Sequence, residues 1–303
     1  MDRRHAYEGQ EVLYRAHPDA QPEGGVIVRF GRPDTAFVLY AGDSLPKATR
    51  LDDLTPRVAP LVDVVPWRDG YLATLDTETT GTDPENDRIV TAVLDVYGAD
   101  GTQARSTSLL VNPGVEIPQT ATDVHGITNE QAQAEGVDPG AAVAALIGAM
   151  YQAWADDLPI VVYNAAFDLT LIDRESRRHL ATPLTLAGPI IDPMVIDRHV
   201  DRYVKGSNQR RQKPTCERYD VTIEDWHTAS ADAYAAQALA RAISAKHDAQ
   251  MPSNLGDMWR WQRTLRRDQA KGLQDYFASI GKTNDDGSPI VIPGDWPMIP
   301  PPN

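Results

Sequence analysis

The chain has 303 residues, of which 42% are hydrophobic and 24% charged, and its formal net charge is -14. A chain of this length can bury one full hydrophobic core and a smaller second one. The acidic balance argues against a passive nucleic-acid coat protein, because such proteins are usually basic. No apolar stretch approaches the roughly 18 residues of a membrane span, so we expect no membrane partner.

Cysteine usage points to a reducing compartment. Cys216 is the single cysteine, which excludes an internal disulfide and a zinc site built from several cysteines. We expect it to be a small core residue. The first eight residues lack the apolar core of a signal peptide. The sequence therefore predicts a cytoplasmic protein.

Residues 1–66 are expected to form a small all-β module. Short apolar runs at 11–14, 25–30 and 36–40 are separated by Pro, Gly and Asp turn signals. Their order, closed by the segment 51–56, resembles an SH3-like small barrel.

Residues 67–248 alternate strand and helix patterns, which predicts an α/β mixed sheet flanked by helices. Thr128 and Gln131 have the spacing of a capping box at a helix start. The expected strands cover 72–76, 88–97, 107–111, 159–163 and 190–192, and the expected helices begin after 128, span 141–155, begin near 166 and span 230–246.

Residues 249–303 are predicted to form a helix and an extended tail. Ser253 and Asn254 can cap a helix that runs to about residue 280. One side of this helix carries Arg260, Arg263, Arg267 and Lys271, which are either a solvated face or phosphate contacts. The tail holds six prolines and is expected to be ordered only if Trp296 and Ile299 dock on the protein.

Two carboxylates mark the end of the first strand of the central segment. Asp76 and Glu78 follow the apolar run 71–75, and residues two apart on a strand point to the same side. Carboxylate oxygens are the preferred ligands of hard divalent cations. The pair alone is weak evidence, because two other Asp-x-Glu sequences occur, at 83–85 and 173–175.

Two further acidic residues stand where helices begin. Asp168 follows the strand 159–163 on the first turn of the next helix, a usual position for a site residue in α/β sheets. Asp232 lies on the first turn of the helix that begins near Ser230. His227 precedes that helix, where a histidine beside carboxylates can accept a proton from water near neutral pH.

Taken together, these residues resemble the DEDDh 3′–5′ exonucleases, the superfamily of the epsilon-type proofreading subunits and ribonuclease T. The resemblance covers residues 67–248 and implies a ribonuclease H-like fold. The matching segments are Leu-Asp-Thr-Glu-Thr-Thr-Gly at 75–81, His-Gly-Ile-Thr at 125–128, Asn-Ala-Ala-Phe-Asp at 164–168, Ile-Ile-Asp at 190–192 and His-x-x-x-x-Asp at 227–232. Pro193 departs from the family's usual residue at its position.

The resemblance also implies the chemistry. Asp76, Glu78, Asp168 and Asp232 are expected to hold two Mg²⁺ or Mn²⁺ ions, and His227 to deprotonate the attacking water. The substrate would be single-stranded or frayed nucleic acid with a free 3′ end, and the products nucleoside 5′-monophosphates. The expected contacts to the terminal nucleotide are Thr77, Thr79, Thr80, His125, Ile127, Asn164 and Phe167.

Several alternatives stay open at this level. A basic run between 198 and 218 is either a solvated loop or a set of backbone phosphate contacts that includes Arg210, Arg211 and Lys213. The protein is either an active exonuclease or a binding module with a vestigial site. The sequence does not separate DNA from RNA. A polymerase or repair protein could be recruited through the N-terminal module or the Pro-rich tail.

Overall fold

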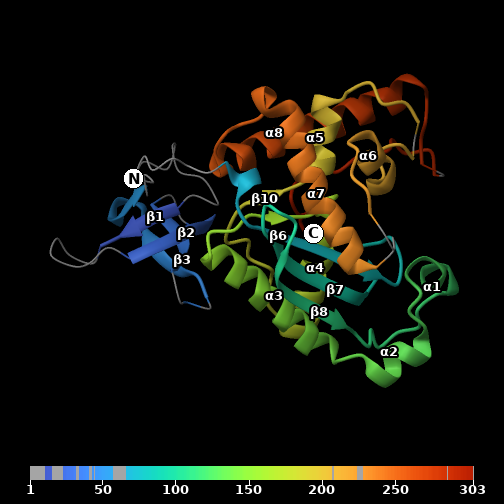
Figure 1. Cartoon of the computed structure of the whole chain (residues 1–303), viewed down its shortest axis with the longest axis horizontal. Coiled ribbons are helices and arrows are strands. Elements are labelled where there is room, and N and C mark those ends of the chain that lie inside the picture. The colour runs from blue at the N-terminus through green and yellow to red at the C-terminus, as the bar shows by residue number, and fades with distance from the viewer. Residues whose placement is uncertain are drawn as a thin grey trace.

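Two β-sheets organise the protein, which is described here from a computed structural model (Figure 1). The structure describes residues 11–15, 23–31, 34–40, 43, 45–56, 66–206, 208–223, 228–284 and 286–302. The smaller sheet lies at one end of the molecule, and the larger sheet lies among the helices (Figure 1). No helix in the described ranges is long and apolar enough to cross a membrane.

The N-terminal sheet is antiparallel, in the order β4-β3-β2-β1-β5. Val12, Ile27, Val38 and Leu54 point into its own small core and are almost completely buried. The N-terminal β-strands were therefore predicted correctly, while their forming a separate module and its closure into an SH3-like barrel stay predictions. The strands are β1 (Glu11–Tyr14), β2 (Glu23–Phe30), β3 (Thr35–Tyr40), β4 (Lys47–Arg50) and β5 (Leu54–Pro56).

The central sheet is mixed, in the order β10-β9-β6-β7-β8. Strand β6 pairs in parallel with β9 and antiparallel with β7, as the alternation of strand and helix patterns predicted. The strands are β6 (Leu72–Thr79), β7 (Ile89–Tyr97), β8 (Gln103–Leu110), β9 (Ile160–Val161) and β10 (Ile190–Ile191).

Helices cover both faces of this sheet. Helix α7 packs on β6 and β7 from one side, and α3 and α4 pack on the other side. The α-helices are α1 (Gln119–His125), α2 (Asn129–Glu135), α3 (Pro139–Ala155), α4 (Ala165–Leu180), α5 (Pro193–Val200), α6 (Gln212–Arg218), α7 (Ala229–His247) and α8 (Leu255–Ser279), with short 3-10 turns at Leu51–Asp53, Trp67–Asp69 and Asp248–Gln250.

Alternation along β6 decides which side chains reach which helices. Ala73 and Leu75 join the core beneath α3 and α4, whereas Leu72 joins the core beneath α7. By the same period of two, Thr74, Asp76 and Glu78 point toward α7. The first strand therefore delivers its acidic pair to the α7 face.

The C-terminal segment is fastened to the central domain. The Trp296 side chain is 5% exposed and donates a hydrogen bond through Nε1 to Asp192 Oδ2, at 3.1 Å. The Ile299 amide donates to Thr170 Oγ1 at 2.9 Å, and Arg174 of α4 donates to the Ile299 carbonyl. Trp296 and Ile299 thus both contact the central domain, which was the expected condition for an ordered tail.

Candidate active site

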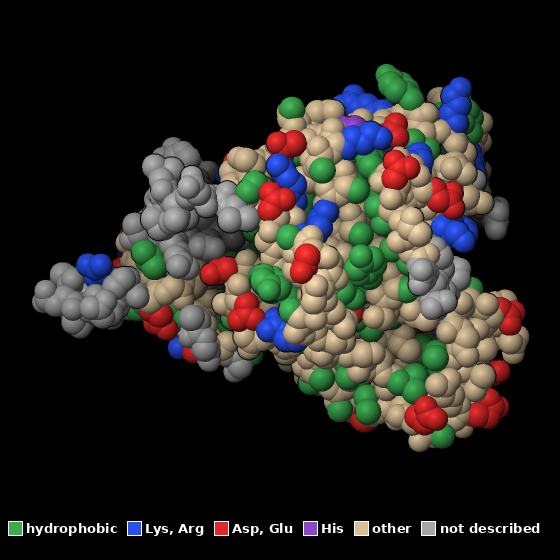
Figure 2. Space-filling model, in the orientation of Figure 1, with side chains coloured by type: hydrophobic (Ala, Val, Ile, Leu, Met, Phe, Trp, Pro, Cys, Tyr) green, Lys and Arg blue, Asp and Glu red, His purple; other side chains and the backbone are tan. Residues whose placement is uncertain are grey.

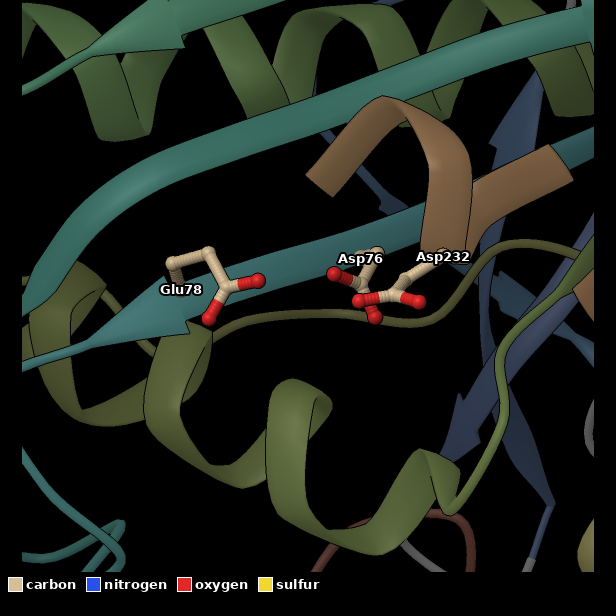
Figure 3. A group of neighbouring side chains, drawn as sticks. All are labelled: Asp76, Glu78 and Asp232. Carbon is tan, nitrogen blue, oxygen red and sulfur yellow. The ribbon is translucent and has the colours of Figure 1, made fainter. Parts of the chain in front are cut away.

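Three carboxylates converge where β6 ends and α7 begins. One oxygen from each of Asp76, Glu78 and Asp232 lies within 4.8 Å of the other two. Figure 3 shows the carboxyl groups of Asp76 and Asp232 side by side, with Glu78 farther along the same strand. The pairing register of β6 with β7 shifts between Glu78 and Thr79, and such bulges re-aim side chains at functional edges.

Helix α7 holds Asp232 in place through its own start. The Thr228 hydroxyl caps the helix by accepting from the Ala231 amide. One turn later, Thr74 Oγ1 of β6 donates to the Ala233 carbonyl at 2.7 Å. Because the residue after Asp232 is tied to β6, the Asp232 carboxylate is kept against the strand that carries Asp76.

Asp168 reaches the same strand from the other face of the sheet. It is 4% exposed on the first turn of α4, and its Oδ1 accepts from both the amide and the hydroxyl of Thr77, at 3.1 and 2.7 Å. Thr77 stands between Asp76 and Glu78 and points to the α4 side. The sequence prediction grouped four acids, and the structure joins three directly and fixes the fourth through Thr77.

The pKa values reflect this crowding. Burial, followed by the charges of Asp168, Asp232 and Glu78, raises the pKa of Asp76 well above its ordinary value. Burial and the charges of Asp232 and Asp168 raise the pKa of Glu78 to about 8. Burial raises the pKa of Asp168 to about 7, although the Thr77 hydrogen bonds oppose the shift. Like charges so close favour a cation between them, and the all-oxygen donor set suits a hard divalent ion.

His227 lies outside the described residues, as do its three predecessors. The described chain resumes at Thr228, the capping residue of α7. The assignment of His227 as the proton acceptor therefore stays a prediction.

A buried carboxylate that sequence reasoning did not assign to the site holds the turn before α4. Asp192 is 1% exposed, and it accepts hydrogen bonds from the amides of Asn164 and Ala165. Asn164 itself has a left-handed backbone, with φ 64° and ψ 48°, which the two bonds stabilise. The sequence signal was present in Ile-Ile-Asp at 190–192, but its partners come from three separate segments.

A hollow of about 380 Å³ opens beside the carboxylates. Its lining includes five residues predicted to hold the metal ions or the terminal nucleotide: Asp76, Thr77, Asn164, Phe167 and Asp168. The residues that sequence reasoning did not assign to the site are Tyr163, Met194, Arg198 and Gln212.

The basic run before α7 contains ion-paired residues and residues that line the hollow. Arg210 and Arg211 both line the hollow. The Arg210 guanidinium also pairs with the buried Asp197, and so does Arg218 at 2.8 Å. Lys213 is exposed on α6 and does not line the hollow. The basic run, for which a solvated loop was one of two open interpretations, thus includes a helix and a buried ion-pair cluster.

The remaining predicted contacts occupy the loop after β6 and the end of α1. Thr79 Oγ1 donates to the Gly81 carbonyl, and Thr80 Oγ1 donates to Asp87. His125 is 9% exposed and its Nδ1 accepts from the Ile127 amide. Its Nε2 is buried without a hydrogen-bond partner among the described residues, and burial lowers its pKa. The Thr79 and Thr80 hydroxyls are thus engaged within the protein, and so is the Thr80 amide, which donates to the Arg88 carbonyl.

The family follows from a sequence comparison. The model of the exonuclease family RNase T matches residues 74–240, more than half of the chain. The chain belongs to this exonuclease family. The match contains Asp76, Glu78, Asp168 and Asp232, so the DnaQ-like DEDDh assignment that the motifs suggested is confirmed.

Two curated relatives resemble this chain in sequence. The DNA polymerase III subunit epsilon-like protein of Rhodobacter capsulatus is 28% identical over 236 residues, which cover 76% of this chain and 30% of the relative. The PolC-type DNA polymerase III of Streptococcus mutans is 26% identical over 190 residues, 62% of this chain and 12% of the relative. The chain therefore spans less than a third of either relative.

Solved structures of E. coli exonuclease I share the fold. The complex with the oligonucleotide dT13 aligns with 60% of this chain and 42% of its own, at 18% identity and a TM-score of 0.51. The complex with dA16 aligns with 67% of this chain and 45% of its own, at 17% identity and a TM-score of 0.52. These alignments support the ribonuclease H-like architecture of the central domain.

Proposed function

We propose that this protein is a metal-dependent 3′–5′ exonuclease that releases nucleoside 5′-monophosphates from the 3′ ends of single-stranded or frayed nucleic acid. The convergence of Asp76, Glu78 and Asp232 from two elements carries the proposal. Surface acids do not usually gather within 4.8 Å on a half-buried strand end, because the mutual repulsion is costly without a cation.

Asp76, Glu78 and Asp232 would hold divalent ions, with Asp168 completing the set. When bound, two Mg²⁺ or Mn²⁺ ions would supply charge stabilisation for phosphodiester hydrolysis. The protein itself positions the carboxylates, because Thr77 fixes Asp168 and Thr74 fixes the start of α7. His227 would accept the proton of the attacking water on a ring nitrogen.

The terminal nucleotide would occupy the hollow beside the acids. Asn164 and Phe167 line it. The backbone around Thr79 and Thr80, where the strand that carries Asp76 ends, would contact the nucleotide from outside the hollow. The unpartnered Nε2 of His125 offers a hydrogen bond to the sugar or the base, and Ile127 offers an apolar contact. Arg210 and Arg211 would contact the adjacent phosphates, with Lys213 farther out.

DNA is the favoured substrate. The support is indirect: the curated relatives are named as DNA polymerase III proteins, and the exonuclease I structures hold DNA oligonucleotides. Proofreading or repair with a separate polymerase, which the N-terminal module or the tail would recruit, fits the same names. The single buried Cys216 agrees with action in a reducing cytoplasm.

Two alternatives have distinct signatures. A vestigial site that only binds nucleic acid would give no mononucleotide product. An RNA 3′-end-trimming enzyme would degrade an RNA oligomer faster than the matched DNA in single-turnover assays.

The test is release of mononucleotides from an end-labelled single strand. We expect activity with Mg²⁺ or Mn²⁺, none in excess chelator, and none for Asp76→Asn, because that change removes a ligand charge. Asp275→Asn, which removes an exposed carboxylate on α8, is the matched control and should retain activity. Full activity in chelator, or cutting of a closed single-stranded circle, would contradict the proposal.

A further inference from the structure

A second and larger hollow lies away from the carboxylates. It encloses about 1040 Å³ between β2 and β3 of the N-terminal sheet, the loop after α4, helix α8 and the tail. It shares no lining residue with the hollow beside Asp76. Most of its walls come from segments outside the family match at 74–240.

The lining is strongly basic. Five arginines border the hollow and a single acid, Asp295, does so. In a chain of net charge -14 this is a local reversal. On the face shown in Figure 2, by contrast, Asp and Glu side chains are scattered widely, including over the lobe of α1 and α2. The five arginines, all exposed, are Arg29, Arg177, Arg260, Arg263 and Arg267.

Neighbouring groups orient some of these guanidinium groups. Arg29 lies over the Phe37 ring, 3.6 Å from its centroid. Arg177 bonds to Asp173 at 2.7 Å, and Arg260 pairs with Asp257. Among the described residues, no carboxylate pairs with Arg263, and the only one near Arg267 is its neighbour Asp268, at 3.9 Å. Arg263 and Arg267 therefore keep most of their charge for a ligand.

A buried donor in the wall lacks a partner. Trp259 is 5% exposed and packs on Trp296, with ring centroids 5.3 Å apart. It lines the hollow, and its Nε1 has no hydrogen-bond acceptor among the described residues. Buried N–H groups in folded proteins are usually bonded, so this one indicates an acceptor oxygen supplied by a ligand.

We propose that this hollow binds the phosphate backbone of single-stranded nucleic acid, as an anchor separate from the site that holds the cut end. The inference rests on the proposed nuclease function. Arg260, Arg263 and Arg267 rise along α8 in steps of about 4.5 and 6 Å, so they present charges in a row. The planar guanidinium fork matches phosphate oxygens bidentately, and the Trp259 N–H adds one further donor.

The anchor acts on long substrates only. A dinucleotide that fills the catalytic hollow cannot also reach a separate one, whereas a long strand held at both gains a high effective concentration at the carboxylates. Variants in the hollow should therefore change the affinity for long strands and leave dinucleotide hydrolysis unchanged.

The test is equilibrium binding of a labelled long single-stranded oligonucleotide to the full chain carrying Asp76→Asn, measured by fluorescence anisotropy over a range of salt. Arg263→Glu is expected to weaken binding and to reduce the slope of log affinity against log salt by about 1. Trp259→Phe, which keeps an aromatic ring but removes the indole N–H, should weaken binding about tenfold. Lys271→Glu is the matched control, because Lys271 lies on α8, pairs with Asp275 and does not line the hollow.

Equal affinities and equal salt slopes for Arg263→Glu and Lys271→Glu would overturn the proposal. So would an Arg263→Glu protein that loses an acidic peptide probe while it keeps the oligonucleotide, because the hollow would then be a peptide site. If thermal unfolding shows that Arg263→Glu is not folded, Arg263→Gln, which removes the charge without reversing it, is tested in its place. Dinucleotide hydrolysis by the chain with native Asp76 distinguishes failure of the nuclease function from failure of the anchor. No hydrolysis would contradict the nuclease function. Hydrolysis together with unchanged long-strand binding by the Arg263→Glu variant would contradict only the anchor.

Discussion

At the scale of residues, the site depends on opposite faces of one strand. Asp76 and Glu78 point toward α7, while Thr77 between them points to α4 and donates both its amide and its hydroxyl to Asp168. A single strand thus connects acids that arrive from both sides of the sheet. A slip of the β6 register by one residue would exchange these faces and place Thr77 among the ligands.

His227 should affect the rate of hydrolysis and not the affinity. We expect His227→Ala to lose about 10²–10⁴-fold in rate, the usual contribution of a general base, with nearly unchanged oligonucleotide binding. Single-turnover rates and anisotropy titrations measure the two quantities. His247→Ala, at the other end of α7, is the control. A loss of affinity in proportion to rate would make His227 a contact residue.

The raised carboxyl pKa values predict how metal-free stability depends on pH. Glu78 has its pKa raised from 4.5 to about 8, and Asp168 from 3.8 to about 7. At pH values between the ordinary and the raised pKa values, the folded state binds more protons than the unfolded state. The free energy of unfolding should therefore fall as pH rises from about 4 to about 8. Urea titrations in chelator at several pH values measure this fall.

Two further measurements test whether the active-site carboxyl groups cause this pH dependence. Saturating Mg²⁺ should flatten the pH dependence, because the ion favours the ionised carboxylates. Glu78→Gln should reduce the slope in chelator. A metal-free protein that grows more stable over this range would show that other groups dominate.

At the scale of elements, the predicted central strands and the long helices were found, because their apolar patterns are strong and local. Strand β8 begins at Gln103, four residues before the expected start, since the exposed polar residues of this edge strand pair with β7 through their backbone. Helices α1, α5 and α6 were missed because each spans only seven or eight residues. Their helical structure depends on tertiary contacts.

The candidate site divides in the same way. Its acids were predictable because each stands at a strand end or a helix start within a short motif. The roles of Asp192 and Trp296 were not, because their hydrogen bond spans 104 residues of chain. Arg210 was one possible phosphate contact, and only the fold reveals that the buried Asp197 pairs with it.

Removing the indole N–H of Trp296 should weaken the turn before α4. Trp296→Phe leaves the buried Asp192 one donor short, which typically costs about 1–3 kcal/mol. We expect a lower thermal midpoint and a reduced rate, because Asp192 also holds the Asn164 and Ala165 amides at the start of the helix that carries Asp168. Trp261→Phe on α8 makes the same change from an indole to a phenyl ring and should change the rate little. Equal effects of the two variants would show that the hydrogen bond between Trp296 and Asp192 is not what supports the turn before α4.

At the scale of the whole molecule, the N-terminal sheet is not isolated from the central domain. Val28, Phe37 and Leu39 pack against the core that includes Trp154 and Trp259. The sheet therefore serves both its own small core and one wall of the basic hollow. The boundary at 66/67 stays a prediction, and a truncation tests it.

A truncated protein that begins at residue 67 should fold and keep metal-dependent activity on short oligonucleotides, since the carboxylates and their supports all lie beyond that point. It should unfold at a lower temperature and bind long strands more weakly, because Val28, Phe37 and Arg29 leave with the sheet. Circular dichroism, thermal unfolding and the two substrate assays measure this. Failure to fold would place the sheet within the nuclease core.

The bond between Trp296 and Asp192 also sets an order of events during synthesis. By the time the ribosome has made the last residue of the family match at 240, every acid of the site has been made. The nascent chain nevertheless carries Asp192 without its indole partner until residue 296 emerges. A premature stop between these points would yield a chain that contains every signature residue but lacks the donor that helps to keep the active-site turn in place.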